Sequence, residues 1–140
     1  MNNNLIEQFI EEHSETVKKF DSSKIDKAVK IMIDALNNGS KIFWCGNGGS
    51  ASQANHLSAE LIGGMYKNKI SPFNSICLNV DTAFLTAWSN DDSFENIFYR
   101  QLQANGKKGD ILVGLSTSGN SININNCLLY TSPSPRDWLQ

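Results

Sequence analysis

The sequence predicts an α/β domain built on a parallel sheet. Three short apolar runs, at 41–45, 75–79 and 111–115, have the length and composition of buried strands. Segments with the apolar spacing of helices separate these runs, and alternating strands and helices are typical of a parallel sheet. Polar turns at 46–50 and 116–121 each follow a strand directly. Both turns should therefore lie at the sheet edge where α/β proteins bind ligands.

Composition limits the classes of function. The chain has 140 residues, 40% of them hydrophobic, and a formal net charge of −2, which suits one domain with its own core. The acidic balance disfavours binding to nucleic acid or to an anionic membrane. No apolar run approaches the roughly 20 residues of a membrane span. The acidic N-terminus does not resemble a secretory signal, and the odd number of cysteines without a CxxC pair favours reduced core thiols in a cytoplasmic protein.

Residues 1–38 predict a helical hairpin that precedes the sheet. Apolar residues recur at helical spacing over 2–20 and again over 24–38. Asp21 begins a plausible cap for the second helix, and Gly39 stands where a left-handed C-cap is expected. Such a pair of amphipathic helices would pack on the sheet or on another subunit.

The central segment reads as strand, glycine-rich turn and helix. The helix should run from Ala51 to about Gly63, and its first N–H groups would face an anion at the turn. The remaining elements follow in order: a loop at 66–73, a strand at 75–79, a short helix capped by Asp81, a polar turn at 89–92, a helix at 93–104, a turn at 105–110, a strand at 111–115 and a helix that begins near residue 120.

The last segment does not continue the pattern. The stretch CLLYTSPSPRD resembles an adapter-derived tail on truncated translations, and its prolines and serines break a helix. We therefore expect residues 1–126 to form a partial domain, with an α/β core at 39–126, and residues 127–140 to be non-native. A genuine proline-rich terminus is the alternative. A foreign tail would mean that the natural protein is longer.

The two turns carry different signals. Gly46, Gly48 and Ala51 match the dinucleotide fingerprint, but the nearest acidic candidate at a strand end, Asp81, lies 35 residues on rather than about 20. The turn at 116–121 gathers several hydroxyls and a glycine at a helix start. Hydroxyls and free N–H groups there can hold a phosphate without a cation. Ordinary capping by one serine is the alternative.

His56 and Glu60 lie four residues apart on the helix predicted to begin at Ala51, and this spacing places them on one face of it. A carboxylate near an anion site can act as a general base, and an imidazole can act as an acid or a metal ligand. A solvated surface pair is the alternative.

Three motifs in this order closely resemble phosphoheptose isomerases of the sugar isomerase (SIS) domain superfamily: CGNGGSASQANHLSAEL, SND at 89–91 and GDILVGLSTSGNS at 109–121. The resemblance covers about residues 5–126. It implies a three-layer α/β/α domain with a five-stranded parallel sheet, of which this chain holds about three strands, assembled as a homotetramer. The implied activity converts D-sedoheptulose 7-phosphate to D-glycero-D-manno-heptose 7-phosphate, a precursor of lipopolysaccharide or capsule heptose.

The resemblance also implies site residues. Glu60 would be the proton-transferring base, and His56 and Glu60 would lie at a zinc site. Substrate would be bound by two groups of residues: Asn47, Gly48, Gly49, Asn90 and Asp91, and, around the phosphate, Ser116, Thr117, Ser118 and Ser121.

The chain departs from the family in one respect. The family's remaining metal ligands, a glutamine and a second histidine, belong to a C-terminal helix, and no histidine follows His56 here. We therefore expect the 140-residue chain to be inactive and poorly folded. A non-catalytic SIS protein, similar to the one that binds the bacterial replication initiator DnaA, is an alternative function, as is an isomerase of hexose phosphates.

Overall fold

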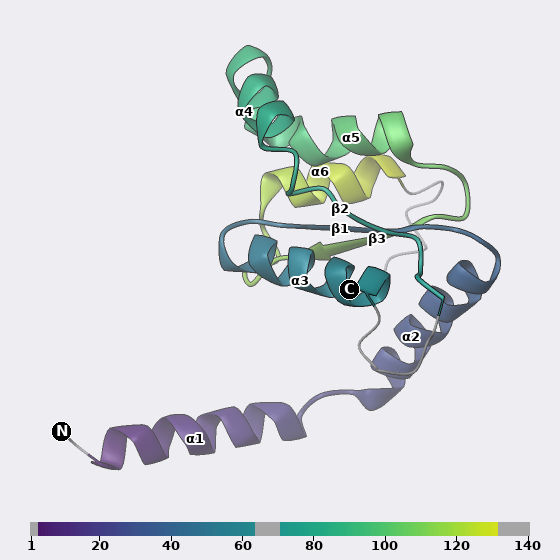
Figure 1. Ribbon diagram of the computed structural model, residues 1–140. Coiled ribbons are helices and arrows are strands. Elements are labelled where there is room, and N and C mark those ends of the chain that lie inside the picture. The colour runs from purple at the N-terminus through teal and green to yellow at the C-terminus, as the bar shows by residue number, and fades with distance from the viewer. Residues whose placement is uncertain (1–2, 64–70, 132–140) are drawn as a thin grey trace. The chain divides into compact units, whose positions relative to one another are not determined.

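A computed structural model describes residues 3–63 and 71–131 of the chain (Figure 1). The chain divides into two compact units, residues 1–33 and 34–140. The first unit consists of helices, and the second contains the sheet and the helices that cover it. Within the described ranges, no helix combines the length and the apolar character needed to cross a bilayer.

Two amphipathic helices open the chain, α1 (Asn3–Lys18) and α2 (Ser22–Asn37). The carboxylate of Asp21 accepts the backbone N–H of Ser23 at 3.0 Å, which confirms the predicted cap. Helix α2 begins two residues before the predicted position. Gly39 follows its end with a φ of +76°, the left-handed conformation expected there.

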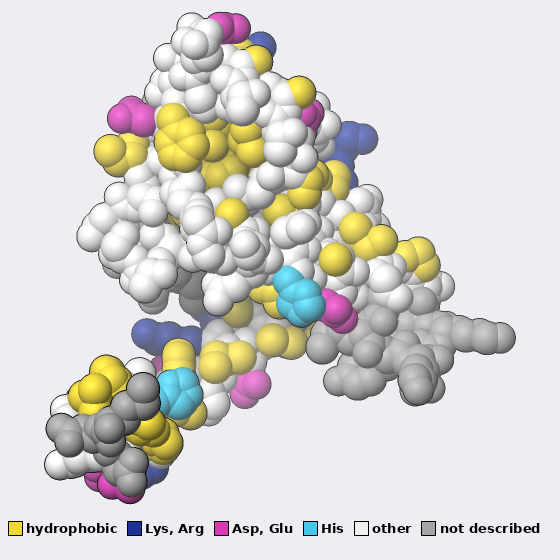
Figure 2. All heavy atoms as spheres, turned by 60° about the vertical axis from the view of Figure 1, so that its left-hand side comes forward, with side chains coloured by type: hydrophobic (Ala, Val, Ile, Leu, Met, Phe, Trp, Pro, Cys, Tyr) yellow, Lys and Arg dark blue, Asp and Glu magenta, His cyan; other side chains and the backbone are white. Residues whose placement is uncertain are grey.

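Most apolar side chains of these helices are exposed in the single chain, and the rest, all on α2, are half-buried. Every α1 side chain from residue 4 onward is exposed, including Phe9 at 62% and Ile10 at 64%, and α2 has no buried residue. Apolar side chains accordingly show at the surface in Figure 2. Both predicted helices are confirmed, but they do not bury their apolar stripes against each other as a packed hairpin would.

The second unit is built around β1 (Ile42–Gly46), which is buried at every residue. It is the middle strand of a three-stranded sheet and pairs in parallel with β2 (Ser75–Cys77) and β3 (Ile111–Leu115). Gly46 lies opposite Leu115 in this register. The predicted parallel sheet is confirmed, with β2 ending two residues earlier than the sequence suggests.

Helices cover both faces of this sheet (Figure 1). Helix α3 (Gly49–Gly63) packs on one face, and α5 (Ile97–Asn105) and α6 (Ile122–Thr131) lie on the other. This is the three-layer α/β/α arrangement. The largest core lies on the α5–α6 side and consists of Phe43, Cys45, Leu78, Ile97, Phe98, Leu102, Ile124 and Cys127.

A buried polar chain fastens α3 to the opposite face. The indole N–H of Trp44 donates to the Ser75 hydroxyl at 2.9 Å, and that hydroxyl lies 3.0 Å from the hydroxyl of Ser58 on α3. All three residues are at most 6% exposed. Each polar group in this layer thus has a partner, as burial requires.

The three cysteines are buried free thiols, in agreement with the prediction of core residues. Burial raises the pKa of the Cys77 thiol. A hydrogen bond with Cys45, and burial after it, raises the pKa of the Cys127 thiol. Thiols held protonated in this way are poor nucleophiles, so we assign the cysteines to packing.

Helix α4 (Thr82–Asp91) is longer than predicted. Asp81 caps it as expected, since its carboxylate accepts the N–H of Phe84 at 2.9 Å. The predicted polar turn is wrong for residues 89–91, which form the last turn of this helix. Leu85 and Trp88 pack against the core at helical spacing, and this packing outweighs the polarity of the residues that follow. A 3₁₀ turn, η1 (Phe94–Asn96), then leads into α5.

The expected domain end at residue 126 falls inside α6, which continues to Thr131. Cys127 is fully buried in the core. Residues 127–131 are therefore structurally part of the α/β unit, and the non-native origin of 127–140 stays a prediction. Residues 132–140, and residues 66–70 of the predicted loop, lie outside the described ranges.

Asp110 ties the start of β3 to the start of β1. Its carboxylate accepts the backbone N–H groups of Lys41 and Lys107, each at 2.8 Å, and lies 3.4 Å from the Lys41 ammonium. Burial alone raises the pKa of Asp110, but these donors and the nearby cation outweigh it and hold the pKa below its ordinary value.

We predict that Asp110→Asn lowers the free energy of unfolding at neutral pH. Because the carboxyl pKa is lower in the folded chain, its contribution is present above the unfolded value of about 3.9 and is lost as the pH falls through the folded value. The difference from the wild type should shrink below about pH 4 in urea titrations at several pH values. Asp26→Asn, an exposed change on α2, is the control. A loss independent of pH would contradict the ionic origin.

Candidate functional site

The two predicted ligand-binding turns lie side by side at one edge of the sheet. The first turn (residues 46–50) follows β1 and the second turn (residues 116–121) follows β3, and these strands are parallel neighbours. A pair of hydrogen bonds joins Asn47 of the first turn to Asn123 in the first turn of α6, the helix that follows the second turn. The prediction of a common rim is confirmed.

The first turn is tight, and two glycines make it possible. A Cβ atom on Gly46 would lie 2.5 Å from both the carbonyl carbon and the carbonyl oxygen of Ser50. Gly48 has a φ of +54°, which L side chains rarely adopt. Helix α3 therefore begins at Gly49, immediately beside the end of β1. The positive end of the helix dipole lies at the sheet edge, where it favours an anion.

The second turn gathers hydroxyls and backbone N–H groups. The hydroxyls of Ser116 and Ser121 lie 3.0 Å apart and are half-buried, whereas Ser118 is exposed. The N–H of Gly119 donates to Ser116 and that of Asn120 to Ser118, each at 3.1 Å. Helix α6 begins directly after this turn. Several neutral donors at a helix start form a suitable cradle for an oxyanion.

Asn123 is a site residue that sequence reasoning missed. It is 3% exposed, and its Nδ2 donates to Asn47 Oδ1 at 2.9 Å while its Oδ1 accepts from Asn47 Nδ2 at 2.8 Å. The predicted substrate contact Asn47 is thus oriented by α6. An asparagine in the first turn of a helix gives no local signal of such a partner.

Asn79 was also missed, because it reads as the end of a strand. Its Oδ1 accepts the N–H of Gly46 at 3.1 Å, and its Nδ2 donates to the Gly46 carbonyl at 2.8 Å. Both backbone groups at the start of the first turn are therefore held by one side chain.

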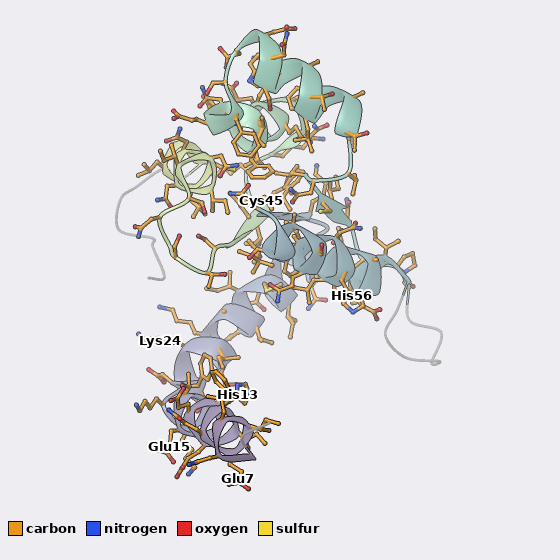
Figure 3. All side chains as sticks on the ribbon, turned by 90° about the vertical axis from the view of Figure 1, so that its left-hand side faces the viewer. Glu7, His13, Glu15, Lys24, Cys45 and His56 are labelled. Carbon is orange, nitrogen blue, oxygen red and sulfur yellow. The ribbon has the colours of Figure 1, made fainter. Side chains whose placement is uncertain are left out.

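His56 and Glu60 lie on α3 as predicted, but the single chain does not enclose them with the turns. His56 is exposed and Glu60 is half-buried, and Figure 3 shows His56 on the outer side of the helix. The ion pairs between described residues join Lys18 to Glu15 and Lys41 to Asp110, so neither includes this pair. That the imidazole borders the pocket stays a prediction.

The donor set for zinc is incomplete in the part of the chain that the structure describes. Histidine, cysteine, aspartate and glutamate form no group of three or more there that could hold a metal ion. A catalytic zinc ion takes three protein ligands and a water molecule. His56 and Glu60 supply at most two ligands, so the described residues alone do not fit a zinc site.

Asn90 and Asp91 are exposed at the end of α4. The Asn90 amide donates to the Asp91 carboxylate at 2.7 Å. Between described residues, no hydrogen bond connects this pair to either turn. Their proposed contact with substrate stays a prediction.

The fold and the turns at its edge define a class of protein: an α/β domain in which two neighbouring parallel strands each lead into a glycine- or hydroxyl-lined turn at the same edge of the sheet. The chain belongs to the SIS domain family, which it matches over residues 7–132.

Curated relatives are phosphoheptose isomerases. The one from Aliarcobacter butzleri is 44% identical over 131 residues, which cover 91% of this chain and 68% of the relative. The one from Akkermansia muciniphila is 52% identical over 100 residues, covering 71% and 52%. This chain thus spans about half to two thirds of the length of these relatives.

Solved structures agree with these matches. A phosphoheptose isomerase from Francisella tularensis superposes with a TM-score of 0.82 at 35% identity, covering 91% of this chain and 65% of that one. The enzyme from Neisseria gonorrhoeae gives 0.76 at 36% identity, covering 89% and 67%. The relation therefore extends over nearly the whole chain in both sequence and fold.

We predict that Gly46→Ala destabilises the α/β unit by about 2 kcal/mol or more, because the added methyl group would collide with the backbone of Ser50 rather than with a movable side chain. Chemical denaturation measures the loss. Gly63→Ala is a matched control, since a Cβ atom there meets nothing within 4 Å and alanine favours the helix. Equal stability of the two variants would show that the turn can relax.

Proposed function

We propose that this chain is part of an aldose–ketose isomerase that converts D-sedoheptulose 7-phosphate to D-glycero-D-manno-heptose 7-phosphate. The observation that carries the proposal is the hydroxyl-lined second turn, which lies beside the first turn at the carboxyl edge of the sheet and leads into α6, the helix bonded to Asn47. The names of the curated relatives support the choice of a heptose phosphate.

The proposed roles follow the two turns. The phosphate group lies on the second turn, where its oxygens accept from hydroxyls and from N–H groups at the start of α6. The sugar extends toward the first turn and the amide of Asn47. The residues assigned to substrate are Asn47, Gly48, Gly49, Asn90, Asp91, Ser116, Thr117, Ser118 and Ser121.

Isomerisation moves a proton between C1 and C2 through an enediol. Glu60 would take the proton from C1 of the ketose and return it to C2. At the same time the C1 hydroxyl loses its proton and becomes the aldehyde carbonyl, and the C2 carbonyl oxygen gains a proton and becomes a hydroxyl. A positioned base contributes about 10²–10⁴-fold to such a transfer. In the chain as described Glu60 is half-buried.

Zinc is a further part of the proposal. His56 and Glu60 would be two of its ligands, and the others would come from outside the described residues. Bound zinc would supply a Lewis acid for the enediolate oxygen. Exposed apolar stripes on α1 and α2 are consistent with assembly, and we propose a cytoplasmic homotetramer.

We predict that Thr117→Val weakens binding of sedoheptulose 7-phosphate to this chain by about tenfold, because a hydrogen bond to a charged oxygen is lost while side-chain volume is kept. Titration calorimetry measures the change. Thr86→Val on α4 removes a hydroxyl that bonds only to its own helix and should leave affinity unchanged. Equal affinity of wild type and Thr117→Val would contradict the assignment of the second turn to the phosphate.

We predict that Glu60→Gln in the isomerase of which we propose this chain is part lowers kcat by about 10²–10⁴-fold with little effect on KM, because the amide keeps the shape of the carboxylate but cannot accept the proton. A coupled assay of heptose phosphate isomerisation measures both constants. The 140-residue chain should show no turnover, since it supplies two candidate zinc ligands and a catalytic zinc ion takes three. If that chain turned over substrate at the rate of a full-length relative, the expectation that its catalytic site is incomplete would be wrong.

A further inference from the structure

We propose that Asn79 and Asn123 are positioning residues that together set the first turn against the second, so that one sugar phosphate can reach both. The inference rests on the proposed function. It concerns the corner formed by Gly46 and Asn47, which both asparagines hold from neighbouring elements.

The Asn79 side chain makes the hydrogen bonds to Gly46 that the backbone of a longer β2 would make. Strand β2 ends at Cys77, and the last backbone bond on that side of β1 runs from the N–H of Leu78 to the carbonyl of Trp44. Two residues further along β1, the backbone groups of Gly46 point to the same side and bond to the Asn79 amide instead. An N–H that needs an acceptor and a carbonyl that needs a donor fix the orientation of this amide.

Asn123 orients the Asn47 side chain, because hydrogen bonds fix the orientation of the Asn123 amide itself. The backbone N–H of Ile124 is shared between the Ser121 carbonyl at 3.1 Å and Asn123 Oδ1 at 3.0 Å, so the side of the Asn123 amide that faces this donor is its oxygen. Its Nδ2 then faces Asn47 Oδ1, and the Asn47 amide can pair with it in only one way. One N–H of Asn47 Nδ2 stays outside this pair and is directed by it.

The two contacts act on successive residues from opposite neighbours. Asn79 comes from the β2 side of β1, and Asn123 comes from α6, which follows β3. Their partners are separated by 33 and 76 residues in the sequence, so the first turn is held by tertiary contacts. Loss of either contact should let the first turn shift while the hydroxyls of the second turn stay in place.

The test compares two probes on the 140-residue chain. Inorganic phosphate should need only the second turn, whereas sedoheptulose 7-phosphate should need both. We expect Asn79→Leu and Asn123→Leu to weaken binding of the sugar phosphate by about tenfold and that of inorganic phosphate by less than about twofold in titration calorimetry. Asn105→Leu, an exposed change at the end of α5, should alter neither affinity.

A selective loss of sugar phosphate binding supports the inference, because a general loss of structure would weaken both probes alike. Equal losses, or unchanged affinity for the sugar phosphate, overturn it. Where a leucine variant does not fold, Asn79→Asp repeats the test, since it keeps the acceptor for the Gly46 N–H and loses the donor to its carbonyl.

A wild-type chain that binds neither probe contradicts the proposed function, and a second measurement then decides the inference. In NMR spectra without ligand, the Gly46 amide proton should exchange faster in Asn79→Leu, and the side-chain NH₂ protons of Asn47 should exchange faster in Asn123→Leu. Unchanged exchange in both variants overturns the positioning role whatever the ligand.

Discussion

The packing of Gly46 against the first turn of α3 is the constraint on which the site depends. With no side chain at residue 46, the helix begins within a few ångströms of the buried central strand. Every other layer of the α/β unit is placed by contact with that strand: β2 and β3 pair with it, and α3 and α5–α6 cover its two faces. The first turn is therefore anchored directly to the middle strand of the sheet.

Elements with strong local signals were predictable from the sequence. The apolar runs of β1 and β3, the cap at Asp81 and the left-handed Gly39 each depend on residues that are close in the chain. Helix α4 was predicted too short because three polar residues at its end resemble a turn. Their helical conformation follows from tertiary packing of the preceding turn, which local polarity does not report.

The candidate site was predictable only in part, for a related reason. The hydroxyls and glycines of the two turns are visible as motifs, and parallel strands bring such turns together without further information. Asn79 and Asn123 find their partners across the fold, so no pattern in their neighbourhood identifies them. The spacing of His56 and Glu60 predicts a shared helix face correctly but carries no information on what covers that face. In the described chain the imidazole is exposed.

The self-bonded second turn has a consequence for how an anion would associate. Because Ser116 and Ser118 already hold the N–H groups of Gly119 and Asn120, the loop has its shape before any ligand arrives. Conformational entropy is then lost during folding and not at the encounter. Affinity at such a loop is the difference between two sets of hydrogen bonds, one internal and one external, and selectivity among oxyanions depends on how well each reproduces the geometry it displaces.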